Sequence, residues 1–450
     1  MLQSPSRIFH RNLNAQLPVA IAGEGVYIRD KQGNRYLDAC GGAAVSCLGH
    51  GHARVIDSIK HQLDSMAYAH SGFFTSEPSE QLAHFLAHRA PDDIEQVYFL
   101  SGGSEAVEAA LKMARQYFLE AGQPSKHKFI ARRQSYHGNT LGALSVSGNR
   151  WRRQQFEPML MNIEHISPCY AYRDQLDGET ERDYGLRVAN ELDSKIEEMG
   201  AENVIAFIAE PVVGATGGAL VPAPGYFKRI REICDKHNIL LILDEVMCGM
   251  GRTGSMFACE QEAVRPDIIT IAKGLAAGYQ PIGATLCSNH IYSQFRDGSG
   301  AFQHGHTYVG HATACAAALA VQQTIEDDNL LDNVNRIGEL LNLALHDRFG
   351  EHPYIGDIRG RGLFRALELV ADRDTKAPLS HELSIAAEIK KQGMAQGLAC
   401  YPNSGTIDGL NGDHVLLAPP YIIDQTHVEE IVDKLGLAVD AALNLKGILI

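Results

Sequence analysis

The sequence lacks any apolar run of about 18 residues, which is the length that a membrane-spanning helix needs. The stretch from Met1 to Ala20 also lacks the basic region and apolar core of a secretory signal. Basic residues are too few to balance the acidic ones, and the net charge of -14 argues against nucleic acids or anionic membranes as partners. We therefore expect a cytoplasmic protein that acts on small molecules.

Paired cysteines and metal-binding spacings are also missing. The 9 cysteines are odd in number and form no C-x-x-C pair, which suits reduced and mostly buried thiols. His50 and His52 have only glycines beside them, so a turn or cap role is favoured over a metal site. His304, His306 and His311 invite a metal interpretation, but no nearby acidic residue completes a ligand set. We expect no metal.

The chain is long enough for two or three domains of an α/β protein. It has 450 residues, of which 45% are hydrophobic and 21% charged, as in soluble globular proteins. From Leu82 onward, helical and strand patterns alternate, which predicts a mostly parallel sheet flanked by helices. We expect a large domain over residues 55–325. A smaller α+β domain should combine residues 1–54, which include a hairpin near Val26 to Leu37, with residues 326–450.

Two apolar strands end in groups of opposite charge. Residues 239–243 run into Asp244, and residues 267–272 run into Lys273. The carboxyl ends of the strands form the ligand crevice of an open α/β sheet, so the two groups can face one bound molecule. A pyridoxal phosphate enzyme needs this pair, because its lysine forms a Schiff base with the cofactor and its aspartate keeps the pyridine nitrogen protonated. A solvated lysine and a helix-capping aspartate are the alternative.

Further polar groups follow other strands. Residues 97–100 break at Gly102, Gly103 and Ser104 before a helix, an arrangement that suits either an anion site or a plain tight turn. Tyr136 and His137 place an aromatic face in a loop after a strand, where it can stack on a heteroaromatic ring. Glu210 ends the apolar strand 204–209 just before a proline.

Together these motifs resemble class III pyridoxal phosphate-dependent aminotransferases, over nearly the whole chain. The resemblance rests on the ordered segments 101–106, 135–138, 210–212, 243–246, 273–274, 306–308 and 418–420. It implies fold type I and a homodimer, or a tetramer built from dimers, with active sites at the subunit interface. It also implies that Lys273 is the Schiff-base lysine and that Asp244 is the partner of the pyridine nitrogen.

The resemblance assigns roles to other positions as well. Gly103 and Ser104 match the phosphate-binding turn, with Gly102 beside them. Tyr136 and Val246 match the groups on the two faces of the ring, and Glu210 matches the carboxylate near the ring hydroxyl. His137 is expected among the cofactor contacts, and Thr307 should reach the phosphate from the other subunit.

Substrate specificity is expected to follow the ω-amino acid or amine:pyruvate group of this family. Ala215 occupies the place where enzymes that use 2-oxoglutarate often carry a gating glutamate, so we expect pyruvate as the acceptor in a ping-pong mechanism. Ala43 and Ala44 stand where a tryptophan is common, and Phe73 and Phe74 are expected on the opposite wall. We therefore expect bulky amine donors to be accepted.

The usual mobile arginine, expected shortly before Gly412, is missing. Arg365 is then a candidate for the acceptor carboxylate, although a structural arginine is the alternative interpretation.

Other functions stay open on the sequence alone. A 2-oxoglutarate-dependent aminotransferase, an aminomutase or a decarboxylase would share the same motifs. A metal-dependent hydrolase would use the three histidines at 304, 306 and 311. A non-catalytic binding protein is disfavoured, because both Lys273 and Asp244 are intact.

Overall fold

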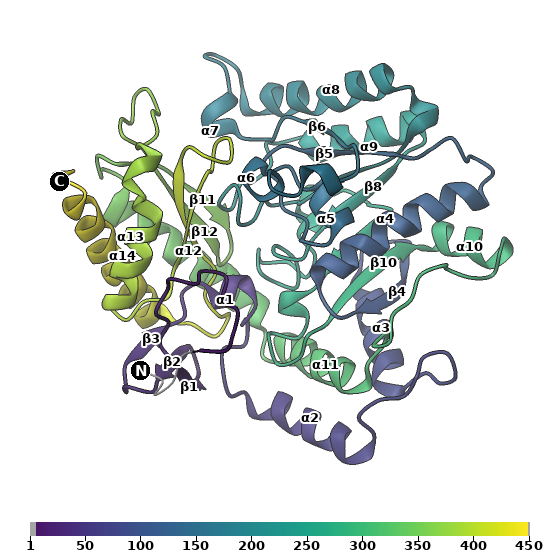
Figure 1. Ribbon diagram of the computed structural model, residues 1–450, viewed down its shortest axis with the longest axis horizontal. Coiled ribbons are helices and arrows are strands. Elements are labelled where there is room, and N and C mark those ends of the chain that lie inside the picture. The colour runs from purple at the N-terminus through teal and green to yellow at the C-terminus, as the bar shows by residue number, and fades with distance from the viewer. Residues whose placement is uncertain (1–5, 449–450) are drawn as a thin grey trace.

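The computed structural model describes residues 6–448, and its largest sheet has 7 strands in the order β4-β10-β9-β8-β7-β5-β6 (Figure 1). β10 is antiparallel to both of its neighbours, and the other neighbouring pairs are parallel. The predicted mostly parallel sheet is therefore confirmed. Its strands are β4 (Ile94–Leu100), β5 (Lys128–Arg132), β6 (Glu164–Ile166), β7 (Val204–Ala209), β8 (Leu240–Asp244), β9 (Ile268–Ile271) and β10 (Gly283–Ser288).

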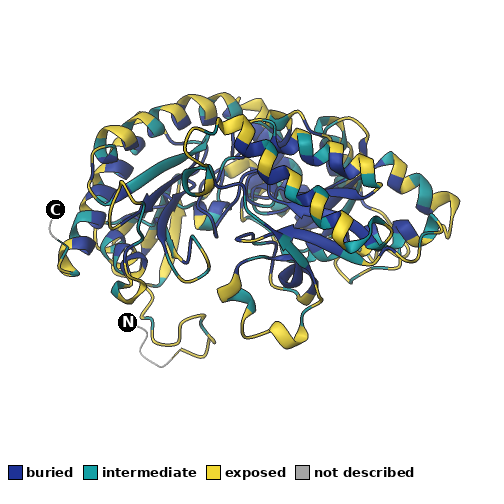
Figure 2. Ribbon diagram, turned by 90° about the horizontal axis from the view of Figure 1, so that it is seen from above, coloured by how far each residue is buried: buried dark blue, intermediate teal, exposed yellow. Residues whose placement is uncertain are grey.

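Helices cover this sheet and keep its central strands out of solvent, as Figure 2 shows by burial. Every residue of β7, β8, β9 and β10 is buried, which explains why these strands read as continuous apolar runs. The surrounding helices are α3 (Glu77–Arg89), α4 (Gly103–Glu120), α5 (Leu141–Val146), α6 (Arg150–Arg153), α7 (Ala171–Asp174), α8 (Glu181–Met199), α9 (Tyr226–His237), α10 (Asn289–Asp297) and α11 (Ala312–Asp327).

A second hydrophobic core joins both ends of the chain. It contains Val26 and Leu37 from the N-terminal part together with Leu417 and Val439 from the C-terminal part. Figure 1 shows the N-terminal strands beside the C-terminal helices. The elements here are β1 (Ala20–Glu24), β2 (Tyr27–Asp30), β3 (Arg35–Leu37), α1 (Gly41–Ala44), α2 (Ala53–Ser65), α12 (Leu330–Phe349), β11 (Ile355–Arg361), β12 (Phe364–Leu369), α13 (Ile385–Ala395), β13 (Tyr401–Ser404), β14 (Asp413–Leu417) and α14 (Gln425–Leu445).

The order of the strands decides which loops share the edge of the large sheet. β7, β8 and β9 are adjacent and parallel, so their carboxyl ends lie side by side. Glu210 follows β7, Asp244 ends β8, and Lys273 lies two residues beyond β9 at the start of the 3-10 turn η4 (Lys273–Leu275). Among residues 6–448, we find no helix long and apolar enough to cross a membrane.

Candidate active site

A cavity of about 430 Å³ lies at this edge of the large sheet. It collects most of the residues that the sequence pointed to, although they come from five separate loops and strand ends. The predicted residues that line it are Gly102, Gly103, Ser104, Tyr136, His137, Glu210, Asp244, Val246 and Lys273. An amine, two carboxylates, an aromatic ring and a helix start therefore surround one volume.

The amine of Lys273 is held in an environment that disfavours its charge. Burial lowers its pKa to about 8, although the nearby carboxylates of Asp244 and Glu210 act in the opposite direction. A minor but far larger fraction of the lysine than usual is then neutral near physiological pH, and the neutral form is the one that acts as a nucleophile or general base. The residue also has a φ of 47°, in the left-handed region that side chains with a Cβ rarely adopt. Such backbone strain clusters at functional sites.

Asp244 is buried and fully engaged in hydrogen bonds. Its Oδ2 lies 2.7 Å from His137 Nδ1, and its Oδ1 accepts from the Val246 N–H at 3.0 Å and from Thr270 Oγ1 at 3.3 Å. His137 is therefore a partner of Asp244, and its backbone N–H donates to Ser147 Oγ at 2.8 Å. These contacts fix the carboxylate in one orientation.

Glu210 is buried and keeps one oxygen free. Its Oε1 accepts from the Gly214 N–H at 3.2 Å, whereas Oε2 has no partner among the described residues. Burial raises the pKa of this carboxyl group, and the negative charge of Asp244 raises it further. A free buried carboxyl oxygen needs a polar group to bind, and a hydroxyl on a bound ring fits that need.

The start of α4 forms an anion cradle. Gly102 precedes the helix without a side-chain cap, so the positive end of the helix dipole is available to a ligand. A Cβ at Gly103 would lie 2.8 Å from Val246 Cγ1, so only glycine lets the backbone approach this closely. Ser104 Oγ accepts from the Asn139 N–H at 3.0 Å, which leaves its hydroxyl hydrogen available.

Several predicted residues lie away from the cavity within one chain. Phe73 and Phe74 are 81% and 67% exposed. Thr307 is exposed in a loop, where its carbonyl accepts from the Tyr68 hydroxyl at 2.8 Å. Ala44 is buried in a cluster with Met247, and neither it nor Ala43 lines the cavity.

Residues that follow no motif complete the lining. The N-terminal segment contributes Val45, and the loop before β10 contributes Gln280, Pro281 and Ile282. Thr270 supports Asp244 from β9. The sequence offered a signal for Thr270 alone, since it is the one polar side chain inside an apolar strand.

Arg365 is not available to a substrate. Its guanidinium is bound by the carbonyls of Gly338, Gly360 and Gly362 at 3.0–3.1 Å, and the side chain is buried. The structural interpretation of this arginine therefore holds, and the carboxylate interpretation was wrong. A guanidinium with three internal acceptors has little left to offer a ligand.

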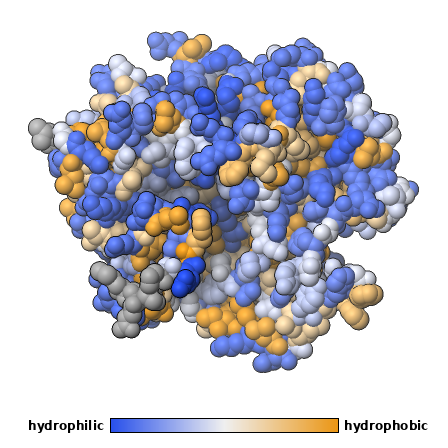
Figure 3. Space-filling view, in the orientation of Figure 1, coloured by the Kyte–Doolittle hydropathy of each residue, from blue (hydrophilic) through white to orange (hydrophobic). Residues whose placement is uncertain are grey.

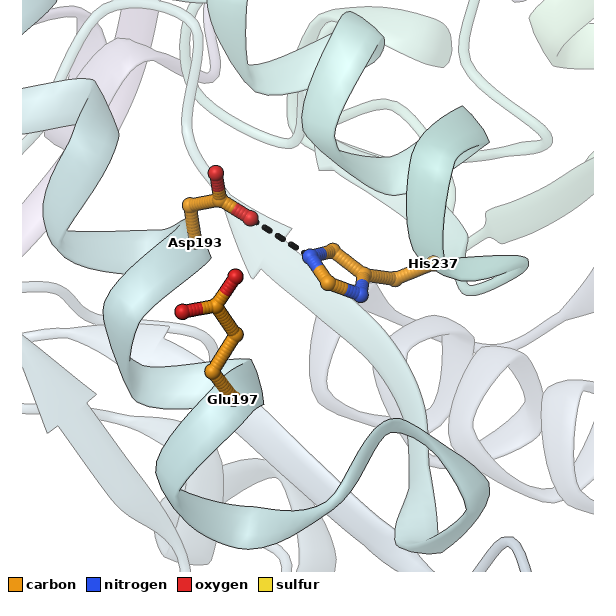
Figure 4. Close-up of side chains that lie close together, drawn as sticks. All are labelled: Asp193, Glu197 and His237. Atoms are coloured by element: carbon orange, nitrogen blue, oxygen red, sulfur yellow. Dashed lines mark hydrogen bonds and ion pairs between the residues drawn. The ribbon is translucent and has the colours of Figure 1, made fainter.

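The three histidines of the hydrolase hypothesis do not converge. His304 Nδ1 lies 2.9 Å from the Lys112 amine, and His311 caps α11 by accepting from the Ala314 N–H. Within residues 6–448, the group of side chains close enough to share a metal ion is Asp193, Glu197 and His237 on α8 and α9 (Figure 4). Asp193 is already paired with Lys236 at 2.8 Å and with His237 at 2.5 Å, so this group forms an ion-pair network.

These features define a class of protein before any comparison. A partly buried strand-end lysine of lowered pKa, a histidine-supported aspartate and an anion cradle around one cavity suit an enzyme that uses pyridoxal phosphate. Residues 9–439 match the model of the family described as Aminotransferase class-III. The chain therefore belongs to the class III aminotransferases and is a pyridoxal phosphate-dependent enzyme of fold type I.

Individual relatives agree with this family. The chain is 45% identical over 437 residues to an uncharacterized aminotransferase of Schizosaccharomyces pombe, covering 97% of this chain and 95% of that protein. It is 40% identical to the uncharacterized aminotransferase YodT of Bacillus subtilis, covering 98% and 99%. The solved omega transaminase of Pseudomonas jessenii in complex with PMP has a TM-score of 0.92 and 33% identity, covering 99% of this chain and 98% of that one.

Pyridoxal phosphate fits the groups that surround the cavity. It supplies an aldehyde for substrate amines and a protonated ring that takes up negative charge during the reaction. The α4 cradle would hold its phosphate, Asp244 would keep the ring nitrogen protonated, and Glu210 Oε2 would meet the ring hydroxyl. Lys273, whose charged form is disfavoured by burial, is the group that would move the substrate proton.

Proposed function

We propose that this aminotransferase moves the amino group of an ω-amino acid or amine to pyruvate by a ping-pong mechanism. In this proposal Lys273 is the Schiff-base lysine and proton carrier, Asp244 is the partner of the pyridine nitrogen, and Gly102, Gly103 and Ser104 hold the phosphate. The single observation that carries the choice of acceptor is Ala215, which is buried beside Met247 and offers no carboxylate to gate an arginine.

The shape and chemistry of the cavity support an apolar donor. Val45, Met247, Pro281 and Ile282 line it beside Lys273, so a hydrocarbon chain or ring can leave water there. A related solved structure is a thermostable omega transaminase variant, with a tryptophan replaced by glycine, that was engineered for asymmetric synthesis of enantiopure bulky amines. In this chain the small residues 43 and 44 come just before Val45, the N-terminal residue that lines the cavity.

A second copy of the chain is part of the proposal. Phe73, Phe74 and Tyr308 expose 81%, 67% and 57% of their surface, and large apolar side chains left in solvent suit an interface with another chain. Figure 3 shows further hydrophobic side chains beside the N-terminal segment and over α2. A homodimer, or a tetramer of dimers, would cover these side chains and bring Thr307 to the partner's phosphate site. The chain would divide into residues 1–54, 55–325 and 326–450.

The acceptor is tested by half-reactions of the pyridoxamine form of the enzyme. We expect pyruvate to restore the aldehyde form, seen in the visible spectrum, faster than 2-oxoglutarate does, with alanine as the product. Faster reaction with 2-oxoglutarate would contradict the proposal. Product analysis with each donor separates transamination from an aminomutase or decarboxylase reaction.

A further inference from the structure

The charges that line the cavity leave a substrate carboxylate without a partner. Glu210 and Asp244 are acidic, and the proposed function uses the Lys273 amine for the Schiff base and the proton transfer. No arginine lines the cavity among the described residues, and Arg365 is bound by backbone carbonyls elsewhere. A 2-oxo acid that enters this cavity needs a cation from just beyond its lining, because a carboxylate that loses water must be paired.

Arg152 is placed to supply that cation. It lies on α6 (Arg150–Arg153), and its guanidinium carbon is 4.7 Å from the centroid of the Tyr136 ring. Tyr136 is itself part of the cavity lining. The guanidinium therefore lies against a residue that lines the site, at the distance of a cation–π contact.

The guanidinium of Arg152 is free of other acceptors. Over the part of the chain that the structure describes, no carboxylate or carbonyl accepts a hydrogen bond from it, and its contacts are the rings of Tyr136 and Trp151. The next residue, Arg153, differs sharply, since it donates to the carbonyls of Leu144 and Ser147. Arg152 is only partly exposed, so its five donors are neither fully hydrated nor used internally.

The charge of Arg152 also acts on the reacting groups. Burial raises the pKa of the Tyr136 phenol, and Arg152 is the largest charge that opposes this rise. Burial lowers the pKa of Lys273, and Arg152 lowers it further. Since Coulomb interactions between partly buried groups fade with distance, both effects agree with a guanidinium that lies within electrostatic range of the cavity.

We propose that Arg152 binds the carboxylate of the 2-oxo acid acceptor and of ω-amino acid donors. This inference rests on the proposed function and names the residue that would recognise the substrate carboxylate. A guanidinium matches a carboxylate with two parallel hydrogen bonds, which a lysine cannot reproduce. Because Arg152 is held by aromatic rings and not by internal hydrogen bonds, it can turn toward a carboxylate in the cavity and stay outside the lining when an uncharged bulky amine enters.

The test compares Arg152→Gln with the parent enzyme in half-reactions of the pyridoxamine form. We expect kcat/KM for pyruvate and 2-oxoglutarate to fall about 100-fold, as hydrogen bonds between charged groups commonly contribute. Propanal, a carbonyl compound without a carboxylate, should react within about threefold of the parent rate, since it never uses the lost contact. Arg152→Lys should recover only part of the loss.

Two matched controls lie nearby. Arg150→Gln changes the same charge on the same helix but at an exposed position. Arg11→Gln removes the other arginine whose charge acts on Tyr136. We expect both variants to keep the parent preference for carboxylate substrates, and loss of that preference in either one would overturn the assignment to Arg152.

A binding measurement separates this inference from the choice of acceptor. Titration of the cofactor-loaded enzyme with propionate, which has no reactive carbonyl, should show binding that Arg152→Gln loses and Arg150→Gln keeps. An unchanged propionate affinity in Arg152→Gln, or an equal loss of rate with propanal and pyruvate, would refute the role of Arg152. Absence of transamination in the parent enzyme would refute the proposed function, while the propionate titration would still decide the inference.

Discussion

At the scale of single residues, the site depends on ionisable side chains that are shielded from water and held by neighbouring polar groups. Lys273 lies at a partly buried position that disfavours its charge, and the carboxylate of Asp244 is held by His137, Thr270 and a backbone N–H. A buried carboxylate with three hydrogen bonds is held rigidly, so its field at the cofactor position needs no rearrangement during the reaction.

Lys273→Ala should abolish turnover and change how the cofactor-free protein responds to pH. The folded-state pKa of about 8 lies below the ordinary lysine value, so the unfolded chain binds more protons between about pH 8 and 10.5. Stability of the parent therefore rises with pH across this window, and the full penalty is present below it. We expect Lys273→Ala to be more stable than the parent at pH 7, with the difference shrinking toward pH 10.5.

Denaturant unfolding of the two cofactor-free proteins at several pH values measures this effect. If the difference in unfolding free energy between the parent and Lys273→Ala stays constant from pH 7 to 10.5, folding does not lower the pKa of Lys273. Residual transamination by Lys273→Ala, with free cofactor supplied, would remove the lysine from its proposed role.

Asp244→Asn keeps the shape of the side chain but removes its charge. We expect kcat to fall by ~10²–10³ or more, the range typical of positioned electrostatic groups. Thr270→Val is the matched control, because it removes only the 3.3 Å hydrogen bond to the same carboxylate and should cost far less. Steady-state rates of the three proteins with one amine donor test this prediction. Near-parental turnover in Asp244→Asn would mean that another group is the partner of the pyridine nitrogen.

At the scale of elements, a turn of unusual handedness comes just before Val45, which lines the cavity. All four residues of α1 have positive φ, with 70° at Ala43 and 63° at Ala44. A left-handed turn costs roughly 1–2 kcal/mol for each residue that has a Cβ, so only small side chains suit it. The backbone conformation of this turn therefore helps to explain why residues 41–44 are all small.

A tryptophan at position 44 would not probe the pocket cleanly. Ala44 is buried against Met247, so Ala44→Trp would overpack that cluster, whereas Val45 lines the cavity itself. We expect Val45→Trp to lower kcat/KM for bulky ω-amines while small donors keep their rates. Ala44→Gly, which relaxes the turn, serves as the control, and equal rates for bulky donors in Val45→Trp and parent would place the donor pocket elsewhere.

Sequence reasoning worked best where chemistry follows a buried strand. Asp244, Glu210 and Lys273 could be placed together because adjacent parallel strands end at one edge of the sheet. It failed for side chains that reach the cavity through long-range packing. Val45 follows no strand, and no local pattern predicts that Arg152, the proposed carboxylate partner, lies beside Tyr136.

At the scale of the whole molecule, a buried charge network joins the two cores. Glu368 on β12 accepts from Arg359 on β11 and from Arg173 on α7, each at 2.6 Å, and from the Tyr170 hydroxyl. Arg359 also donates to the Gly217 carbonyl in the loop after β7. Burial by itself would raise the pKa of Glu368, but the two guanidinium groups bring it below the ordinary value.

Glu368→Gln should destabilise the protein strongly, because it removes the negative partner of Arg173 and one of the two carboxylates that pair with Arg359. We expect a loss of roughly 3–5 kcal/mol in the free energy of unfolding, measured with urea. Glu326→Gln breaks the ion pair with Arg89 at a half-exposed position and should cost under about 1 kcal/mol. Similar losses in both variants would show that the buried network adds nothing beyond a surface pair.

The reversed direction of β10 has a consequence for how this enzyme can change over time. Because β10 is antiparallel to β9, it begins at the same edge where β9 ends, and the loop of residues 272–282 must cross the crevice. That loop carries the lysine at one end and Gln280, Pro281 and Ile282 at the other. Exchanges at 280–282 can therefore reshape substrate range while the strands stay in register, which makes this short segment a natural target for loop libraries.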